Sequence, residues 1–190
     1  ETIVLDKDST GMLWITYTQS NKVYVNHSRT SDSDWSPAAA TQLNVAGTNS
    51  NVSPDDISTL VAVDGKIGVL WSNESSGQFS GSSDTAFYFA VHTDGAADTL
   101  WTGGVALRQP NIADDHINLK SLQADTSGNI FVVVKTSLNT VGDPQLLLLV
   151  AKKQANGSYS WNAYIESVRE EAQTRPLLLI DTDHRQLYVF

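Results

Sequence analysis

Cysteine is absent from the 190-residue sequence, which excludes a disulfide framework and any metal site built on thiolates. No run of Lys or Arg is found either, and 12 basic residues against 21 acidic ones give a formal net charge of −9. A chain this acidic is a poor candidate for binding nucleic acid or an anionic membrane surface. Its longest purely apolar run, residues 146–151, is far too short to cross a bilayer. We therefore expect neither nucleic acid nor a membrane among its partners.

Helical periodicity is nearly absent as well. Only residues 167–173 could form a turn or two of helix, and they carry no apolar stripe to bury. The lack of Cys suits a bacterial secreted protein that needs no oxidative folding, so we expect an extracellular location. No signal peptide precedes the first predicted strand, so an export signal would have been removed or would lie outside this sequence.

Strand-like segments, in contrast, recur in groups of four along the chain. The predicted segments are 2–6, 12–18, 22–27 and 35–43; 58–63, 67–72, 85–92 and 101–107; 118–124, 129–136, 145–152 and 160–166; and finally 175–180 and 186–190. Aligning an aromatic residue in the second strand of each group gives spacings of 57, 60 and 57 residues, and the residues are Trp14, Trp71, Phe131 and Tyr188. We expect these four to occupy equivalent positions. Four antiparallel strands in a repeat of this length are typical of a β-propeller blade.

The predicted fold is all-β, a β-propeller segment of about three and a half four-stranded blades in an incomplete ring. The whole chain forms one such segment, with blades at 1–57, 58–117 and 118–174 and a partial blade at 175–190. Propellers usually have four to eight blades, so this number cannot close a ring. We interpret the chain as a fragment of a longer protein, or as one that a partner subunit completes. Its open ends would expose unpaired strand edges, which favour association.

The turns between third and fourth strands repeat a second feature, a small polar turn followed by a Trp. The three copies cover residues 31–35, 93–101 and 156–161, and they end at Trp35, Trp101 and Trp161. Polar side chains form such turns by bonding to backbone amides, and we expect each Trp to pack between blades. These turns resemble a degenerate Asp-box, the S-x-D-x-G-x-x-W element of bacterial neuraminidase repeats.

Over its whole length, at the level of repeats, the chain thus resembles the sialidase-like (bacterial neuraminidase repeat, Asp-box) β-propellers. The resemblance implies a secreted propeller that binds or processes an acidic glycan at the central mouth. If the protein is an enzyme, the resemblance implies a glycoside hydrolase or a polysaccharide lyase. No cofactor is expected.

Strand alternation sorts the loops of such a fold onto two faces. The turns between first and second strands share one face with the turns between third and fourth strands. The other face gathers the long segments 44–57, 73–84, 108–117, 137–144 and 167–174. Ligand sites concentrate on loops that a rigid scaffold presents, so we expect the site on this second face.

Polar residues stand where the predicted blades begin, thirteen residues before each aligned aromatic: Glu1, Ser58, Asn118 and Arg175. In sialidases, arginines at blade starts clamp the substrate carboxylate, often in an Arg-Ile-Pro context, which residues 174–177 resemble. A guanidinium suits this task because it pairs bidentately with a carboxylate. The resemblance therefore implies that Arg175 binds substrate, together with Asn118, Asp115 and Asp56.

The run Asp115-His116-Ile117-Asn118 is reminiscent of an Asp-His-Asn context in related propellers that cleave uronate polymers by β-elimination. It makes His116 the candidate catalytic residue, since a His near neutral pKa can give or take a proton. No metal is predicted, because too few carboxylates cluster near Asp56 to fill the six or more oxygen positions of Ca²⁺.

Plainer alternatives stay open for each candidate. His116 could simply cap the start of a strand, Asp56 could form a polar turn, and Arg175 could pair with Glu170 or Glu171. A sialidase also needs three such arginines and a Tyr–Glu pair, whereas this chain offers one arginine at an aligned blade start. The second hypothesis is accordingly a non-catalytic interaction or scaffold propeller, which the acidic net charge favours.

Overall fold

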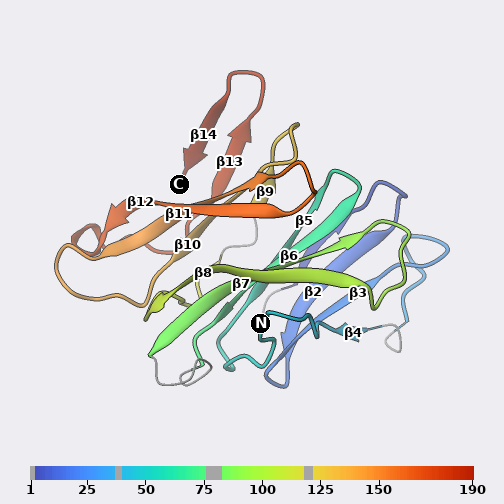
Figure 1. Cartoon of the computed structure of the whole chain (residues 1–190), viewed down its shortest axis with the longest axis horizontal. Helices are drawn as coiled ribbons and strands as arrows, with labels where there is room; N and C mark the ends of the chain where they lie inside the picture. Colours follow the sequence, from blue (N-terminus) through green and yellow to red (C-terminus); the bar gives the residue numbers. More distant parts are fainter. Residues whose placement is uncertain (1–2, 37–39, 76–82, 118–121) are drawn as a thin grey trace.

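The computed structural model describes residues 3–36, 40–75, 83–117 and 122–190. Within these residues, fourteen strands form four antiparallel sheets, each built from strands that are consecutive in the chain (Figure 1). Sheet I contains β1 (Val4–Lys7), β2 (Leu13–Gln19), β3 (Lys22–His27) and β4 (Thr41–Gln42). Sheet II contains β5 (Ser58–Val63), β6 (Lys66–Asn73), β7 (Asp84–Thr93) and β8 (Trp101–Pro110). Sheet III contains β9 (Leu122–Ala124), β10 (Ile130–Lys135), β11 (Pro144–Lys153) and β12 (Tyr159–Val168), and sheet IV contains β13 (Leu178–Asp181) and β14 (Gln186–Val189).

These sheets confirm the all-β prediction and its grouping of strands into three sets of four and one of two. The predicted strand bounds need corrections at two places. The fourth strand of sheet I has two residues instead of spanning 35–43, although Trp35 forms an isolated bridge with Ser28. The strand predicted to begin at Arg175 begins at Leu178, because Arg175 has a left-handed φ of 53° and therefore lies outside the extended region. Among the described residues, η2 (Arg169–Glu171) is a single 3₁₀ turn, and no helix is long and apolar enough to cross a bilayer.

The four aligned aromatics do not occupy equivalent positions, contrary to the prediction. Trp14 pairs with His27 of the third strand, but the residue that pairs with the corresponding His92 is Ile67. The cause is the length of the first turn. Five residues separate the paired ends of β1 and β2, whereas the two-residue turn Asp64-Gly65, with φ of 51° and 68°, joins β5 to β6. The near-constant spacing of the aromatics therefore does not mark a structural repeat.

The core consists mainly of two apolar layers, one on each face of sheet II. Alternate residues of β7 divide between them: Phe87 and Phe89 join the layer shared with sheet III, and Tyr88 joins the layer shared with sheet I. Because both faces of sheet II are covered, its central strands are buried almost throughout. The first strands of successive sheets, β1, β5, β9 and β13, also contact one another in chain order. The sheets are thus packed face to face in sequence.

The turns fall onto the two faces that strand alternation predicts. Ser9, in the first turn of sheet I, donates its backbone N–H to Asp94, in the last turn of sheet II, at 3.0 Å. Lys153, where β11 ends, pairs with Asp64 in the first turn of sheet II at 2.5 Å. First and last turns of neighbouring sheets therefore meet, and the long loops gather at the opposite end of the strands.

Candidate functional site

Contacts between the long loops close the opposite face of the molecule. The backbone N–H of Glu74, which follows β6, donates to Asp56 Oδ1 at 3.1 Å, and Asp56 precedes β5. Ser137, which follows β10, donates its hydroxyl to the carbonyl of Ala113 at 2.6 Å. The first bond joins the connection between sheets I and II to a loop of sheet II, and the second joins the connection between sheets II and III to a loop of sheet III. Polar residues far apart in the sequence therefore meet on this face.

The centre of the site is the run Asp114-Asp115-His116. His116 Nδ1 lies 2.5 Å from Asp114 Oδ1 and also contacts Asp115 Oδ1. Asp114 is buried, and its second oxygen pairs with the ammonium of Lys135 at the end of β10. The partners of the imidazole all lie at Nδ1 within the described part of the chain, which leaves Nε2 available for a hydrogen bond with a ligand.

The pKa values of Asp114 and Asp115 are shifted in opposite directions. Burial raises the pKa of Asp114, but hydrogen bonds from Asp115, Lys135 and His116 outweigh burial and lower that pKa below its ordinary value. Burial raises the pKa of Asp115, and the hydrogen bond to Asp114 raises it further. Of the two, Asp115 therefore binds a proton more readily than Asp114, whose carboxylate is held in its ionised form by its hydrogen bonds.

Glu74 belongs to the same cluster, although sequence reasoning did not single it out. Burial, followed by the negative charges of Asp56, Asp114 and Asp115, raises the pKa of Glu74 to about 7. A carboxyl with such a pKa exchanges its proton near neutral pH, as general acids and bases do. The one available indication was its position, because residues 73–84 were assigned to the site face.

Asp56 is fully enclosed, with no exposed surface. Its carboxylate accepts the backbone N–H of Ser53 at 2.6 Å and the backbone N–H of Glu74 at 3.1 and 3.2 Å. It fastens the segment before β5 to the segment after β6. In this enclosure Asp56 acts on a ligand only through its charge, part of which reaches Glu74.

The remaining predicted residues are placed less centrally. Asn118 lies outside the described residues. Arg175 is exposed and, among the described residues, is not one of those that line the cavity beside Asp114. The arginine that does line this cavity is Arg169, in the same connection between sheets III and IV.

This cavity has a volume of about 270 Å³ and is open to solvent on the face of the long loops. Its walls are mainly polar: Asp114, Lys135, Thr136, Ser137, Leu138, Asn139, Gln145 and Arg169. The Arg169 guanidinium pairs with no carboxylate of the described chain, since the adjacent Glu170 and Glu171 accept backbone N–H groups instead. An unpaired guanidinium beside a cavity favours an anionic ligand.

Gln145 forms the inner wall of the cavity and is only 5% exposed. It lies in a β-bulge: Pro144 pairs with Val168 and Leu146 pairs with Ser167, so Gln145 has no partner in β12. Bulges re-aim side chains and are common beside functional sites. Its Oε1 atom is buried and accepts no hydrogen bond from the described residues. A buried acceptor without a donor costs about 1–3 kcal/mol, which a hydroxyl-bearing ligand would recover.

A metal ion fits the cluster poorly. The ligand atoms of Asp114, Asp115 and His116 lie within 4.8 Å of one another, which is close enough to surround an ion. However, the ammonium of Lys135 already pairs with Asp114, and His116 Nδ1 lies against both carboxylates. These donors satisfy one another, so we assign no metal to the site.

The chain matches no protein-family model and no curated protein. Function therefore has to be argued from the chemistry of the site.

Proposed function

We propose that the chain is a segment of a secreted, sialidase-like β-propeller that binds an acidic sugar unit in the cavity between Gln145 and Arg169. Sheets packed face to face, with first strands in contact in chain order, support the propeller arrangement. The observation that carries the binding proposal is the cavity itself, where an unpaired guanidinium faces the same space as a buried acceptor without a donor.

The chemistry of a uronate or a sialic acid matches these two groups. Its carboxylate pairs with the Arg169 guanidinium, and one of its hydroxyls donates to Gln145 Oε1. The cavity, at about 270 Å³, is close to the lower end of the usual range of roughly 300–1,000 Å³ for ligand pockets. It accommodates one sugar unit of a glycan, with the neighbouring units in solvent.

Processing of the bound sugar would draw on the proton-exchanging groups next to the cavity. In a β-elimination, a base removes the proton beside the uronate carboxylate, the carbon–oxygen bond to the leaving sugar breaks, and an acid protonates the leaving oxygen. His116 and Glu74 are the groups suited to these two transfers, since Glu74 has a pKa of about 7 and the imidazole keeps Nε2 available. Arg169 would hold the carboxylate whose charge otherwise opposes loss of the proton.

The alternative is a non-catalytic interaction or scaffold propeller, and exposed apolar side chains on the first and last sheets favour it. Leu5 of β1 is 55% exposed and Leu179 of β13 is 50% exposed. Further blades, from a longer chain or from another subunit, would cover these side chains. This alternative places the function on the outer sheets and not in the polar cavity.

The test is a calorimetric or NMR titration of the chain with galacturonate, N-acetylneuraminate and, as an uncharged control, glucose. We expect the two acids to bind and glucose not to bind at the cavity. Arg169→Gln should weaken acid binding by at least about tenfold, the effect of losing a charged hydrogen bond of roughly 1.5–3 kcal/mol. Arg175→Gln is the matched control, because Arg175 does not line the cavity.

Loss of binding in Arg175→Gln but not in Arg169→Gln would move the site to the start of sheet IV, as the sequence resemblance implied. If neither acid binds, the interaction hypothesis replaces this one. Processing is tested separately, by following unsaturated products from polyuronides and free sugar from sialosides. Retained binding without turnover would leave a binding protein.

A further inference from the structure

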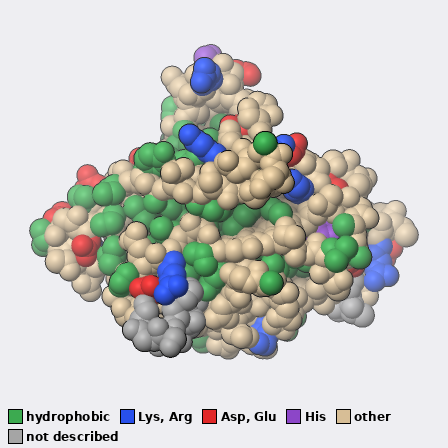
Figure 2. All heavy atoms as spheres, viewed as in Figure 1, with side chains coloured by type: hydrophobic (Ala, Val, Ile, Leu, Met, Phe, Trp, Pro, Cys, Tyr) green, Lys and Arg blue, Asp and Glu red, His purple; other side chains and the backbone are tan. Residues whose placement is uncertain are grey.

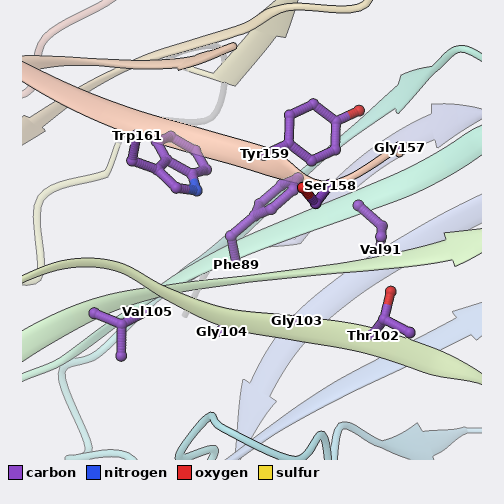
Figure 3. A pocket seen from close by; sticks show the side chains of 10 residues that line it. All are labelled: Phe89, Val91, Thr102, Gly103, Gly104, Val105, Gly157, Ser158, Tyr159 and Trp161. Carbon is purple, nitrogen blue, oxygen red and sulfur yellow. The ribbon is translucent and has the colours of Figure 1, made fainter. Parts of the chain in front are cut away.

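A second hollow lies on the outer side of the molecule, between the last strands of sheets II and III. Its volume is about 240 Å³, and in Figure 3 it is bounded by β8 and β12. Figure 2 shows hydrophobic side chains gathered in a band between these strands. The lining residues are Phe89, Val91, Thr102, Gly103, Gly104, Val105, Gly157, Ser158, Tyr159 and Trp161. None of them carries a charged side chain, in contrast to the cavity beside Asp114.

Trp161 differs from the two tryptophans at the same place in sheets I and II. The indole N–H of Trp35 donates to the carbonyl of Asp32 at 2.7 Å, and that of Trp101 donates to the carbonyl of Asp98 at 2.8 Å. Both acceptors lie three residues before the Trp. Within the described residues, the indole N–H of Trp161 donates to no acceptor, and its nitrogen is turned toward the middle of the groove (Figure 3).

The other two tryptophans are also bonded: Trp14 donates to Asp8 Oδ2 and Trp71 to the carbonyl of Asn49, both at 2.9 Å. Trp161 is therefore the one indole whose donor the described chain leaves unused. A half-buried indole usually finds a partner for its N–H, and such residues are common where a protein contacts a ligand.

Aromatic rings form one wall of the groove. The ring of Phe89 lies 5.5 Å from that of Tyr159 and 5.3 Å from that of Trp161, edge to face in both cases. This packing fixes the wall in place. The opposite wall is the outer edge of β8, which pairs with no further strand in the described part of the chain.

The β8 side of the groove has little side-chain bulk, because two of its lining residues are glycines. A Cβ atom at Gly104 would meet nothing within 4 Å, so the backbone beside it is open to the groove. A ligand can thus lie against bare backbone on one side and aromatic faces on the other, with the hydroxyls of Thr102 and Ser158 at the rim.

We propose that this groove binds one neutral pyranose ring. The apolar face of a sugar ring packs against Tyr159 and Trp161, and a ring hydroxyl accepts the hydrogen bond from Trp161 Nε1. Other hydroxyls bond to the open backbone of β8. Absence of charge in the lining selects a neutral sugar, and a volume of about 240 Å³ accommodates a single ring. The site is independent of the acidic-sugar proposal, since the two hollows share no residue.

The test is a two-dimensional ¹H–¹⁵N NMR titration of the whole chain, whose five tryptophans give five indole resonances. The probes are the methyl glycosides of glucose, galactose and mannose, up to about 50 mM, which covers weak single-ring affinities. Trp161→Phe assigns the resonance. We expect saturable movement of the Trp161 signal with at least one glycoside, while the other four signals stay in place.

Gly104→Leu is the blocking variant, because Gly104 lines the groove and a Cβ atom there meets nothing within 4 Å. It should weaken the Trp161 response by about tenfold or more and leave the four other indole signals unchanged, which shows that the fold persists. Asn162→Leu, on the exposed opposite side of β12, adds the same side chain outside the groove and should have no effect. Arg169→Gln should also leave the response intact.

Three results would overturn the proposal: no movement of the Trp161 signal with any of the glycosides, an equal response in Gly104→Leu, or movement that follows protein concentration instead of sugar concentration. The last result would assign the groove to contact with a second copy of the chain.

Discussion

Glu74 is a partly buried carboxyl whose pKa is raised by burial and by the negative charges of neighbouring aspartates. Burial, reinforced by Asp56, Asp114 and Asp115, raises its pKa to about 7 from an ordinary value of 4.5. In the unfolded chain the same carboxyl would release its proton at the ordinary pKa. Between pH 4.5 and 7 the folded state therefore binds more protons than the unfolded state, and the free energy of unfolding falls as pH rises.

Glu74→Gln should remove the part of this fall in the free energy of unfolding that is caused by ionisation of Glu74. At pH 8 we expect the variant to be more stable than the parent by about 1–2 kcal/mol, after allowing for solvent screening of a half-exposed group. At pH 4, where the parent carboxyl is protonated in both states, the two proteins should be equally stable. Urea denaturation at the two pH values measures the difference. Glu166→Gln, at an exposed carboxylate on β12, serves as the control and should change little at either pH.

The same pH dependence in parent and Glu74→Gln would show that neither burial nor the aspartates raise the pKa of this carboxyl. The variant would then give no reason to assign Glu74 a role in proton transfer.

Residue-scale features of the site were only partly predictable from the sequence. The run Asp114-Asp115-His116 is visible as a polar cluster ahead of a strand, and the structure does bring these side chains together. Nothing in the sequence indicated that Gln145 lines a cavity, because its position there depends on a β-bulge in the pairing of β11 with β12. The prediction of Arg175 relied on the sequence around it and on its distance from Tyr188, and that distance assumed an equivalence of the aligned aromatics that the register does not support.

At the scale of elements, strand content was predictable while strand register was not. Runs such as Ile130–Lys135, rich in β-branched residues, identify strands by composition alone. Register depends on the length of each turn, and a constant spacing between aromatic residues gives no information about turn length. The pair Asp64-Gly65 was the informative signal, since Asp-Gly between two apolar runs is typical of a two-residue hairpin. With that turn fixed, Ile67 takes the place that the alignment gave to Trp71.

The adjacent glycines of β8 allow an element-scale prediction. A Cβ at Gly103 would lie 2.5 Å from the carbonyl oxygen of Phe89 and 2.9 Å from Ala90 Cα, both backbone atoms of β7 that cannot move aside. Gly103→Ala should therefore lower the free energy of unfolding by about 2–3 kcal/mol, as overpacking does.

Gly104→Ala is the matched variant and should be neutral or stabilising by up to about 1 kcal/mol, because its Cβ is unhindered and Ala restricts the unfolded chain. Urea denaturation of both proteins measures the contrast. Equal stabilities would mean that β8 lies farther from β7 than the structure places it.

At the scale of the whole molecule, the central strands β6 and β7 of sheet II are buried almost throughout, whereas the outermost sheets each have one face without an apolar cover. Sheets I and IV present large apolar side chains to solvent on these faces. The exposed fractions are 65% for Ile3, 55% for Leu5, 50% for Leu179, 41% for Tyr188 and 72% for Phe190. The predicted grouping of strands, three sets of four and one of two, already indicated that sheet IV has two strands and that the open ends of the segment are exposed.

These outer surfaces should make the isolated chain associate with itself, because apolar surface exposed beside strand edges favours contact between copies. Leu5→Lys combined with Leu179→Lys places one charge on each outer sheet and should shift the chain toward monomer, as measured by sedimentation velocity over a range of concentrations. Val141→Lys is the matched control: Val141 is 82% exposed, but it lies in the loop between β10 and β11, away from both outer sheets. Association that persists in the double variant, or that Val141→Lys reduces equally, would contradict the role of the outer sheets. It would also remove the support that these surfaces give to further blades packing against them.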